Sequence, residues 1–141
     1  MGEIQVNIEL VNQEDEVLAR KGHLAAEQIR SIKTVAVVDT GAIMLAVPVE
    51  IADALGLEIK EVMTAYFADG RSEELPVAEG IRLRFPDLNL SMTAECVVLP
   101  PGSTEILIGQ IPLERLDLLA DCKSQKLLPR HPGAKMPVLR V

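Results

Sequence analysis

The residues best suited to chemistry are Asp39, Thr40 and Gly41, which directly follow the apolar run 35–38. That β-branched run predicts a buried strand. A carboxylate at the end of such a strand is costly to desolvate unless it has a partner or a function. Gly41 allows a sharp turn and a close backbone approach. The alternative is a structural turn, in which Asp39 binds its own backbone and Thr40 is a satisfied turn hydroxyl.

Most of the remaining chain has the pattern of β-strands, which must position this acid. Alternating apolar and polar residues predict a half-exposed strand at 2–11. A turn at 12–16 and a returning strand at 17–24 are predicted next. Further strands are predicted at 28–38 (with a break near Ser31), 58–67, 73–78, 81–85, 90–99 and 105–109, followed by a strand or strand pair at 121–128.

Two short helices and one hairpin complete the predicted elements. Pro48–Leu55 fits a helix because proline suits the first helical turn and Gly56 suits the position after the last one. A second helix is predicted at Pro112–Leu119. The turn at Ala68–Ser72 contains Asp-Gly, which supplies the positive φ angles of a tight hairpin. Pro76 predicts that the returning arm is an edge or leaves the main sheet.

Charge and composition exclude several classes of function. The 141 residues suffice for one domain, the net charge is −7, and aromatic residues make up only 2%. An acidic chain with few aromatics is a poor nucleic-acid binder. The best apolar run is interrupted by Asp39, Glu50 and Asp53, so no membrane span is predicted. The N-terminus lacks the pattern of a signal peptide, and we therefore expect a cytoplasmic protein.

The cysteines and histidines give no sign of a metal or redox site. Cys96 and Cys122 are expected to be reduced, partly buried thiols, with a disulfide as the alternative. His23 and His131 are far apart and outside any ligand spacing. We expect neither a metal nor another cofactor.

Four motifs occur in an order that resembles one protease family. They are Val38-Asp39-Thr40-Gly41-Ala42, Leu55-Gly56-Leu57, Ala68-Asp69-Gly70 and Ile108-Gly109. Together they resemble the retropepsin-like aspartic proteases, and more narrowly the small bacterial members of clan AA. The resemblance implies an all-β acid-protease fold with two short helices. It would be a closed or partly open barrel with one lobe per chain, at residues 1–129. Residues 130–141 would form a mobile or dimer-contacting tail.

The resemblance also implies that one chain carries half of a catalytic site. Proteases of this class use two neighbouring carboxylates that share a proton. Only Asp39 lies in an Asp-Thr/Ser-Gly context here, so the second carboxylate would come from a second copy in an obligate homodimer. Asp39 would activate water, Thr40 would bind across the dimer axis, and Gly41 would let the backbone approach the carboxylates.

The same resemblance assigns a substrate site. The Ala68–Ser72 hairpin, with Asp69 and Gly70 at its tip, would be a flap that closes over the substrate. Ala42 and Ile108 are expected to belong to the substrate-binding set, with Ile108-Gly109 packed beneath the catalytic loop. The substrate would be a peptide or protein bound as an extended strand.

Two departures from viral retropepsins qualify these expectations. Viral members commonly have Asp after Asp-Thr-Gly-Ala and Arg after the later Gly, whereas this chain has Ile43 and Gln110. Both partners of an ion pair are missing, which predicts that the dimer would be held by a different, more apolar contact. The flap tip is also less glycine-rich and carries the charged residues Asp69 and Arg71.

Two functions therefore remain open. The first is an aspartic endopeptidase. The second is a catalytically silent dimeric module for binding or assembly, because a fold does not fix a function. The complete Asp39-Thr40-Gly41 favours the first, whereas the unusual flap favours the second.

Overall fold

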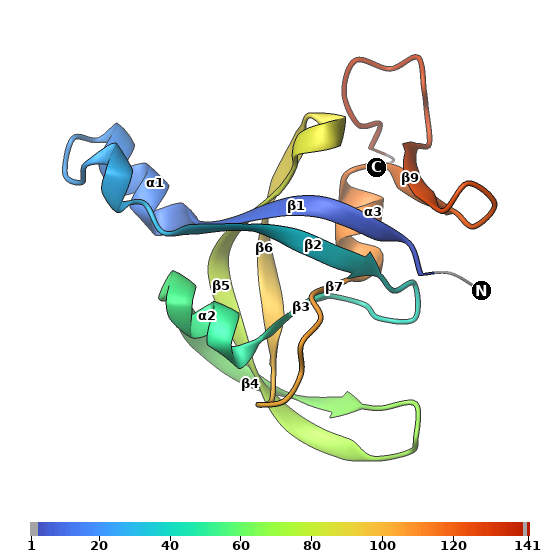
Figure 1. Cartoon of the computed structure of the whole chain (residues 1–141), viewed down its shortest axis with the longest axis horizontal. Helices are drawn as coiled ribbons and strands as arrows, with labels where there is room; N and C mark the ends of the chain where they lie inside the picture. The colour runs from blue at the N-terminus through green and yellow to red at the C-terminus, as the bar shows by residue number, and fades with distance from the viewer. Residues whose placement is uncertain (1–2, 140) are drawn as a thin grey trace.

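The chain forms a β-barrel from which one hairpin projects (Figure 1). The computed structural model describes residues 3–139 and 141. Neighbouring strands in the sheet follow the order β1-β2-β7-β3-β6-β5-β4, and an additional β1–β5 pairing closes the first six into a barrel. The strands are β1 (Gln5–Asn12), β2 (Ser31–Val38), β3 (Leu45–Pro48), β4 (Glu58–Tyr66), β5 (Ser72–Phe85), β6 (Leu90–Leu99) and β7 (Leu107–Ile108).

Aliphatic side chains fill the barrel, as the alternating pattern predicts. In β1, Ile8 and Leu10 are buried while Gln5 and Asn7 are exposed. Phe85 is the largest fully buried side chain of the described residues. The core also includes Ala36, Leu45, Val47, Ile81, Leu83, Cys96 and Ile108. The mainly β fold with short helices therefore agrees with the sequence prediction.

The structure corrects the sequence prediction at residues 13–20. We expected a turn and a returning strand there, but these residues form helix α1 (Gln13–Arg20). The side chain of Asn12 caps this helix by accepting the backbone N–H of Asp15 at 3.0 Å. The first turn is acidic and Arg20 lies in the last turn, which suits the helix dipole. These local signals specify a helix where a turn and a strand were predicted.

The other two helices match the predictions to different degrees. Helix α2 (Val49–Leu55) is confirmed, with Pro48 at its start and Gly56 in the left-handed conformation after its end. Helix α3 spans Gln110–Arg115, so it begins and ends earlier than predicted. Asp117 has a φ of 56°, which is incompatible with a continuing helix. Single 3₁₀ turns, η1 (Ala26–Gln28) and η2 (Pro86–Leu88), lie before β2 and β6.

Strand β5 is one long strand rather than the two predicted at 73–78 and 81–85. Its pairing with β6 is irregular between Ala78 and Ile81, and Gly80 there has a φ of 80°. Such a bulge bends a strand without ending it. Toward Ser72, β5 pairs only with β4, and Pro76 lies in this part. This part of β5 stays in the seven-stranded sheet but has a strand partner on one side only, so of the two alternatives predicted for the arm the structure shows an edge.

The C-terminal part forms a small separate sheet and then folds back. Strands β8 (Leu118–Asp121) and β9 (Lys126–Pro129) pair antiparallel, so the predicted strand or strand pair is a pair. The backbone N–H of Arg130 donates to the carbonyl of Asp117 at 2.8 Å. The Asp117 carboxylate also accepts the backbone N–H of Val138 at 3.1 Å and lies 2.6 Å from Nδ1 of His131. These contacts tie the predicted tail to the end of α3.

Both cysteines are free thiols, as predicted, but they differ in burial. Cys96 is fully buried in β6, and Cys122 is exposed in the β8–β9 turn. Burial raises the pKa of the Cys96 thiol to about 12, so it stays protonated and unreactive. None of the helices in the described part of the chain is long and apolar enough to cross a membrane.

Candidate active site

Asp39 lies at the end of β2, where the barrel backbone holds it in place. Strands β2 and β7 run parallel, with Val38 beside Ile108. The backbone N–H of Asp39 donates to the carbonyl of Ile108 at 3.0 Å, and Val37 donates to Ile106 at 2.8 Å. The ladder therefore continues up to the acid itself. Asp39 is half-buried, whereas the next residues, Thr40 and Gly41, are exposed.

The carboxylate of Asp39 is oriented by its own turn. The Oδ1 atom of Asp39 accepts the backbone N–H of Gly41 at 3.0 Å, and the backbone carbonyl of Asp39 accepts the N–H of Ala42 at 3.1 Å. A Cβ on Gly41 would stand 3.2 Å from the same Oδ1, so a larger residue would crowd the carboxylate. The bond between Asp39 Oδ1 and the Gly41 N–H is the one expected if Asp39 is only a structural turn residue. A catalytic carboxylate in a fixed orientation needs the same bond, so the contact is compatible with both interpretations.

Helix α3 supports the loop from the other side. The N–H groups of Gln110 and Ile111 donate to the carbonyls of Ala42 and Ile43 at 2.9 and 2.8 Å. The first N–H groups of a helix have no partner within it, and here the loop after Asp39 supplies that partner. Gly109 packs directly against the loop, as predicted for the Ile108-Gly109 pair.

The structure thus brings part of the predicted site together. Asp39, Thr40, Gly41 and Ala42 form one turn. The side chain of Ile108 is fully buried beneath it. Because Ile108 has no surface exposed in the described structure, its side chain does not line a groove for substrate. Its carbonyl instead holds the loop by accepting the N–H of Asp39, which corrects our expectation for its role.

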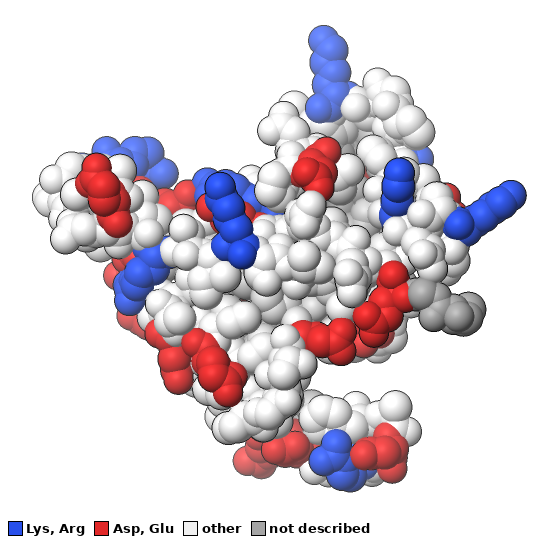
Figure 2. Space-filling view, viewed as in Figure 1, with Lys and Arg blue, Asp and Glu red and all other residues white. Residues whose placement is uncertain are grey.

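The remaining predicted site residues form the tip of the projecting β4–β5 hairpin. Ala68, Asp69 and Gly70 lie in the turn between Phe67 and Arg71, whose backbones are joined by a 2.8 Å hydrogen bond from the Phe67 N–H to the Arg71 carbonyl. Figure 2 shows an open hollow between this hairpin, at the lower right, and the body of the molecule. In Figure 1 the loop that follows β2 lies on the same side as the hairpin tip. In this view the hairpin tip and the loop after β2, which begins with Asp39, therefore lie toward the same side of the molecule.

The hairpin tip is held by its charged residues. Asp69 accepts the backbone N–H of Arg71 at 3.0 Å and its Nε at 2.7 Å. The guanidinium carbon of Arg71 also lies 5.0 Å from the centre of the Phe67 ring, a cation–π distance. These bonds from Arg71, first of all the one from its backbone N–H, lower the pKa of Asp69. The two charges that set this tip apart from viral flaps therefore form one internal clip.

Comparison with known proteins identifies the family. Residues 25–115 match the sequence profile of a family described as "gag-polyprotein putative aspartyl protease". The chain belongs to this aspartyl protease family. The match includes the Asp39 loop, the hairpin and the whole of α3. It agrees with the retropepsin-like barrel predicted from the sequence, whereas the narrower assignment to small bacterial members remains a prediction.

One solved structure gives a further point of comparison. The solution structure of Simian Foamy Virus (mac) protease is similar to this chain at 17% identity, with a TM-score of 0.46. The alignment covers 77% of this chain and 92% of that one. No curated protein sequence matches the chain significantly.

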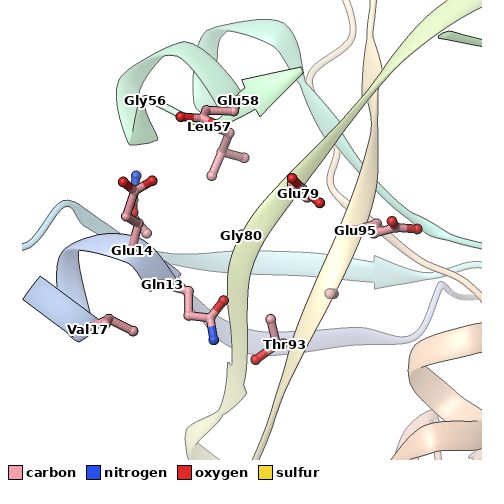
Figure 3. A pocket seen from close by; sticks show the side chains of 12 residues that line it. Gln13, Glu14, Val17, Gly56, Leu57, Glu58, Glu79, Gly80, Thr93 and Glu95 are labelled. Atoms are coloured by element: carbon pink, nitrogen blue, oxygen red, sulfur yellow. The ribbon is translucent and has the colours of Figure 1, made fainter. Parts of the chain in front are cut away.

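A separate cleft lies away from the Asp-Thr-Gly turn of this aspartyl protease chain. Its volume is about 490 Å³, and it is lined by the start of α1, the α2–β4 connection, the β5 bulge and β6 (Figure 3). Two of its carboxylates, Glu79 and Glu95, form ion pairs with Lys60. The bond to Glu95 is also the main reason that the pKa of Lys60 is raised. Both carboxylates bind the same lysine, and no residue of the Asp39 turn lines this cleft, so it does not replace the Asp39 site.

Sequence reasoning missed one residue of the site. Nε2 of Gln110 donates to the carbonyl of Thr40 at 2.9 Å. From the sequence, Gln110 only marked the absence of the arginine that viral members of the family carry. The contact joins residues 70 positions apart, and no local pattern could have revealed it. The side chain of Ile43, whose carbonyl accepts the N–H of Ile111, is 63% exposed.

Proposed function

We propose that this chain is an aspartic endopeptidase that acts as a homodimer on peptide or protein substrates. Each chain would contribute one Asp39 to a shared site. Family membership and the barrel support a protease-type function. The proposal goes further, to the catalytic residue, the dimer and the reaction.

The chemistry requires two Asp39 carboxylates close together. Two like charges at that distance do not both ionise readily, so the pair holds one proton and titrates as a unit. The ionised member takes a proton from a water molecule, whose oxygen attacks the peptide carbonyl. The protonated member hydrogen-bonds the carbonyl oxygen and supports the charge that develops on it. Proton transfer to the leaving nitrogen then completes cleavage and restores the shared proton.

The observation that carries the proposal is the fixed but accessible position of Asp39. Its backbone is tied to Ile108, its Oδ1 to Gly41, and the loop to the first turn of α3. Thr40 and Gly41 beside it are exposed. A rigid, open carboxylate at the end of a barrel is suited to meet a second copy across a two-fold axis.

The projecting hairpin supplies the second part of the proposal. It would cover an extended substrate, exclude water and contact the substrate backbone through Ala68, Asp69 and Gly70. Ala42, next to the catalytic turn, would contact the substrate from the opposite side. The hollow between the hairpin and the body of the molecule in Figure 2 would hold the substrate.

The test is cleavage of a peptide library by purified protein at mildly acid and neutral pH, beside Asp39→Asn. This variant keeps the size of the side chain but cannot share a proton as a carboxylate pair does. We expect cleavage by the wild type and a loss of at least about 10³-fold in the variant. Equal cleavage by both proteins would exclude Asp39 as the catalytic group. A dimer that binds peptides without cleaving them would point instead to the silent binding module.

A further inference from the structure

One peptide group links Gln110 to the candidate catalytic carboxylate. The carbonyl of Thr40 accepts Nε2 of Gln110 at 2.9 Å. The N–H of the same peptide unit belongs to Gly41, and it donates to Oδ1 of Asp39 at 3.0 Å. Because a peptide unit is planar, its two ends cannot rotate independently. A hold on the Thr40 oxygen is therefore also a hold on the N–H that orients Asp39.

The direction of the side-chain bond is unambiguous. A carbonyl oxygen can only accept, so the amide NH₂ of Gln110 must face Thr40. Accepting a hydrogen bond at the oxygen also polarises the peptide unit and strengthens the donor at its other end. The contact thus both fixes and strengthens the bond from Gly41 to Asp39.

The side chain of Gln110 adds to a support that the helix backbone already provides. The backbone N–H groups of Gln110 and Ile111 hold the carbonyls of Ala42 and Ile43, further along the loop. Neither of these bonds reaches the Thr40–Gly41 peptide unit. Among the bonds that α3 makes to this loop within the described residues, the one from the Gln110 amide does reach it.

We propose that Gln110 is a positioning residue for the Asp39 carboxylate, acting through the Thr40–Gly41 peptide unit. Because positions 43 and 110 are both uncharged, no ion pair between them can hold this loop. The neutral amide of Gln110 would hold it instead, within one chain. The inference rests on the proposed function for its kinetic consequence. Its structural part, the orientation of Gly41 N–H, stands independently of activity.

The experiment compares Gln110→Met, Gln110→Ala and Gln110→Arg with the wild type. Methionine matches the length of glutamine without the N–H donor, whereas arginine keeps a donor at a similar reach. We expect kcat to fall about 3- to 10-fold in the Met and Ala variants with KM unchanged, and to recover largely in the Arg variant. Gln5→Met, an exposed glutamine on β1, is the matched control and should leave kcat unchanged.

A second readout does not require catalysis. Hydrogen exchange of the Gly41 amide, measured by NMR, should be faster in Gln110→Met than in the wild type and Gln5→Met. If Gly41 exchange and kcat are both unchanged in the Met and Ala variants, the positioning role is overturned. If the wild type cleaves nothing, the proposed function fails, and the Gly41 amide still decides whether Gln110 orients this peptide unit. Equal losses in the Met and Arg variants would also contradict the proposal.

Discussion

Gly109 lies so close to the carbonyl oxygen of Met44 that a Cβ built on it would stand 2.5 Å away. The same Cβ would lie 2.8 Å from the carbonyl oxygen of Ala42. Both neighbours are backbone atoms of the loop after Asp39, so neither can rotate out of the way. A glycine is therefore required here because of space, since the φ angle of Gly109 is −92° and open to any residue.

Gly109→Ala should separate the loop after Asp39 from α3. The added methyl group must push the backbone apart, which we expect to lower the free energy of unfolding by about 1–3 kcal/mol. Peptidase activity should fall as the loop shifts. Chemical denaturation measures the first effect. Gly133→Ala is the matched control, because no atom lies within 4 Å of its Cβ position, and equal stability of the two variants would contradict the packing argument.

Much of the fold was predictable because its signals are local. The alternation in β1, the Pro48 and Gly56 boundaries of α2, and the Asp-Gly turn at 69–70 each act within a few residues. Helix α1 was also encoded locally, by the Asn12 cap, but this signal was not recognised and a turn and a strand were predicted there. The family resemblance predicted a barrel, but not that β1 and β5 close it, since this pairing joins distant segments.

The candidate site divides in the same way. Asp39, Thr40 and Gly41 stand out because their types and order are unusual after an apolar strand. The supporting role of Gln110 and the early start of α3 depend on carbonyls of the loop at residues 40–43. Such contacts form only in the folded chain. The sequence therefore identifies the acid, and the structure identifies what holds it.

Arg71→Ala should loosen the hairpin tip without unfolding the protein. The variant keeps the backbone bond to Asp69 but loses the side-chain ion pair with Asp69 and the stacking on Phe67. The ion pair is exposed, and exposed ion pairs contribute little to global stability. We expect an unchanged thermal midpoint and faster amide exchange at Gly70, whose N–H donates to the Phe67 carbonyl. Lys135→Ala, at an exposed position in the C-terminal segment, is the control. Unchanged exchange at Gly70 would show that the charged clip does not stiffen the tip.

Asp15 should give the fold an acid-sensitive anchor. This buried carboxylate accepts three hydrogen bonds from Arg30, at 2.8–3.0 Å, and the side-chain bond to Arg30 lowers its pKa from the usual 3.8. The stabilisation is complete above pH 3.8 and is lost as the pH falls through the lower pKa of the folded state. Asp15→Ala should therefore cost about 1–3 kcal/mol at neutral pH.

The difference between wild type and Asp15→Ala should shrink as the pH falls below 3.8, because the wild type then loses the same anchor. Urea denaturation at several pH values measures it. Asp53→Ala, at an exposed position in α2, should change stability by less than about 0.5 kcal/mol at each pH. A pH-independent difference between wild type and Asp15→Ala would contradict the role of the charged carboxylate.

Mixing wild type with Asp39→Asn should reveal whether two chains form one site. If a mixed dimer is inactive, random pairing of equal amounts leaves about a quarter of the dimers with two Asp39 residues, and activity falls to about 25% of an equal total of wild type. Chains that act alone would retain about 50% by the same reasoning. The proteins are unfolded together and refolded, so that chains exchange fully, and peptide cleavage is then measured.

The matched control for this experiment is wild type refolded with Asp53→Asn, which changes an exposed aspartate outside the site. That mixture should keep full activity, because every pairing contains two Asp39 residues. Sedimentation of the same samples supplies the independent measurement, since the mechanism requires dimers at the assay concentration. Cleavage near the 50% value, or a strict monomer that cleaves peptides, would contradict a shared site and require a second acid within one chain.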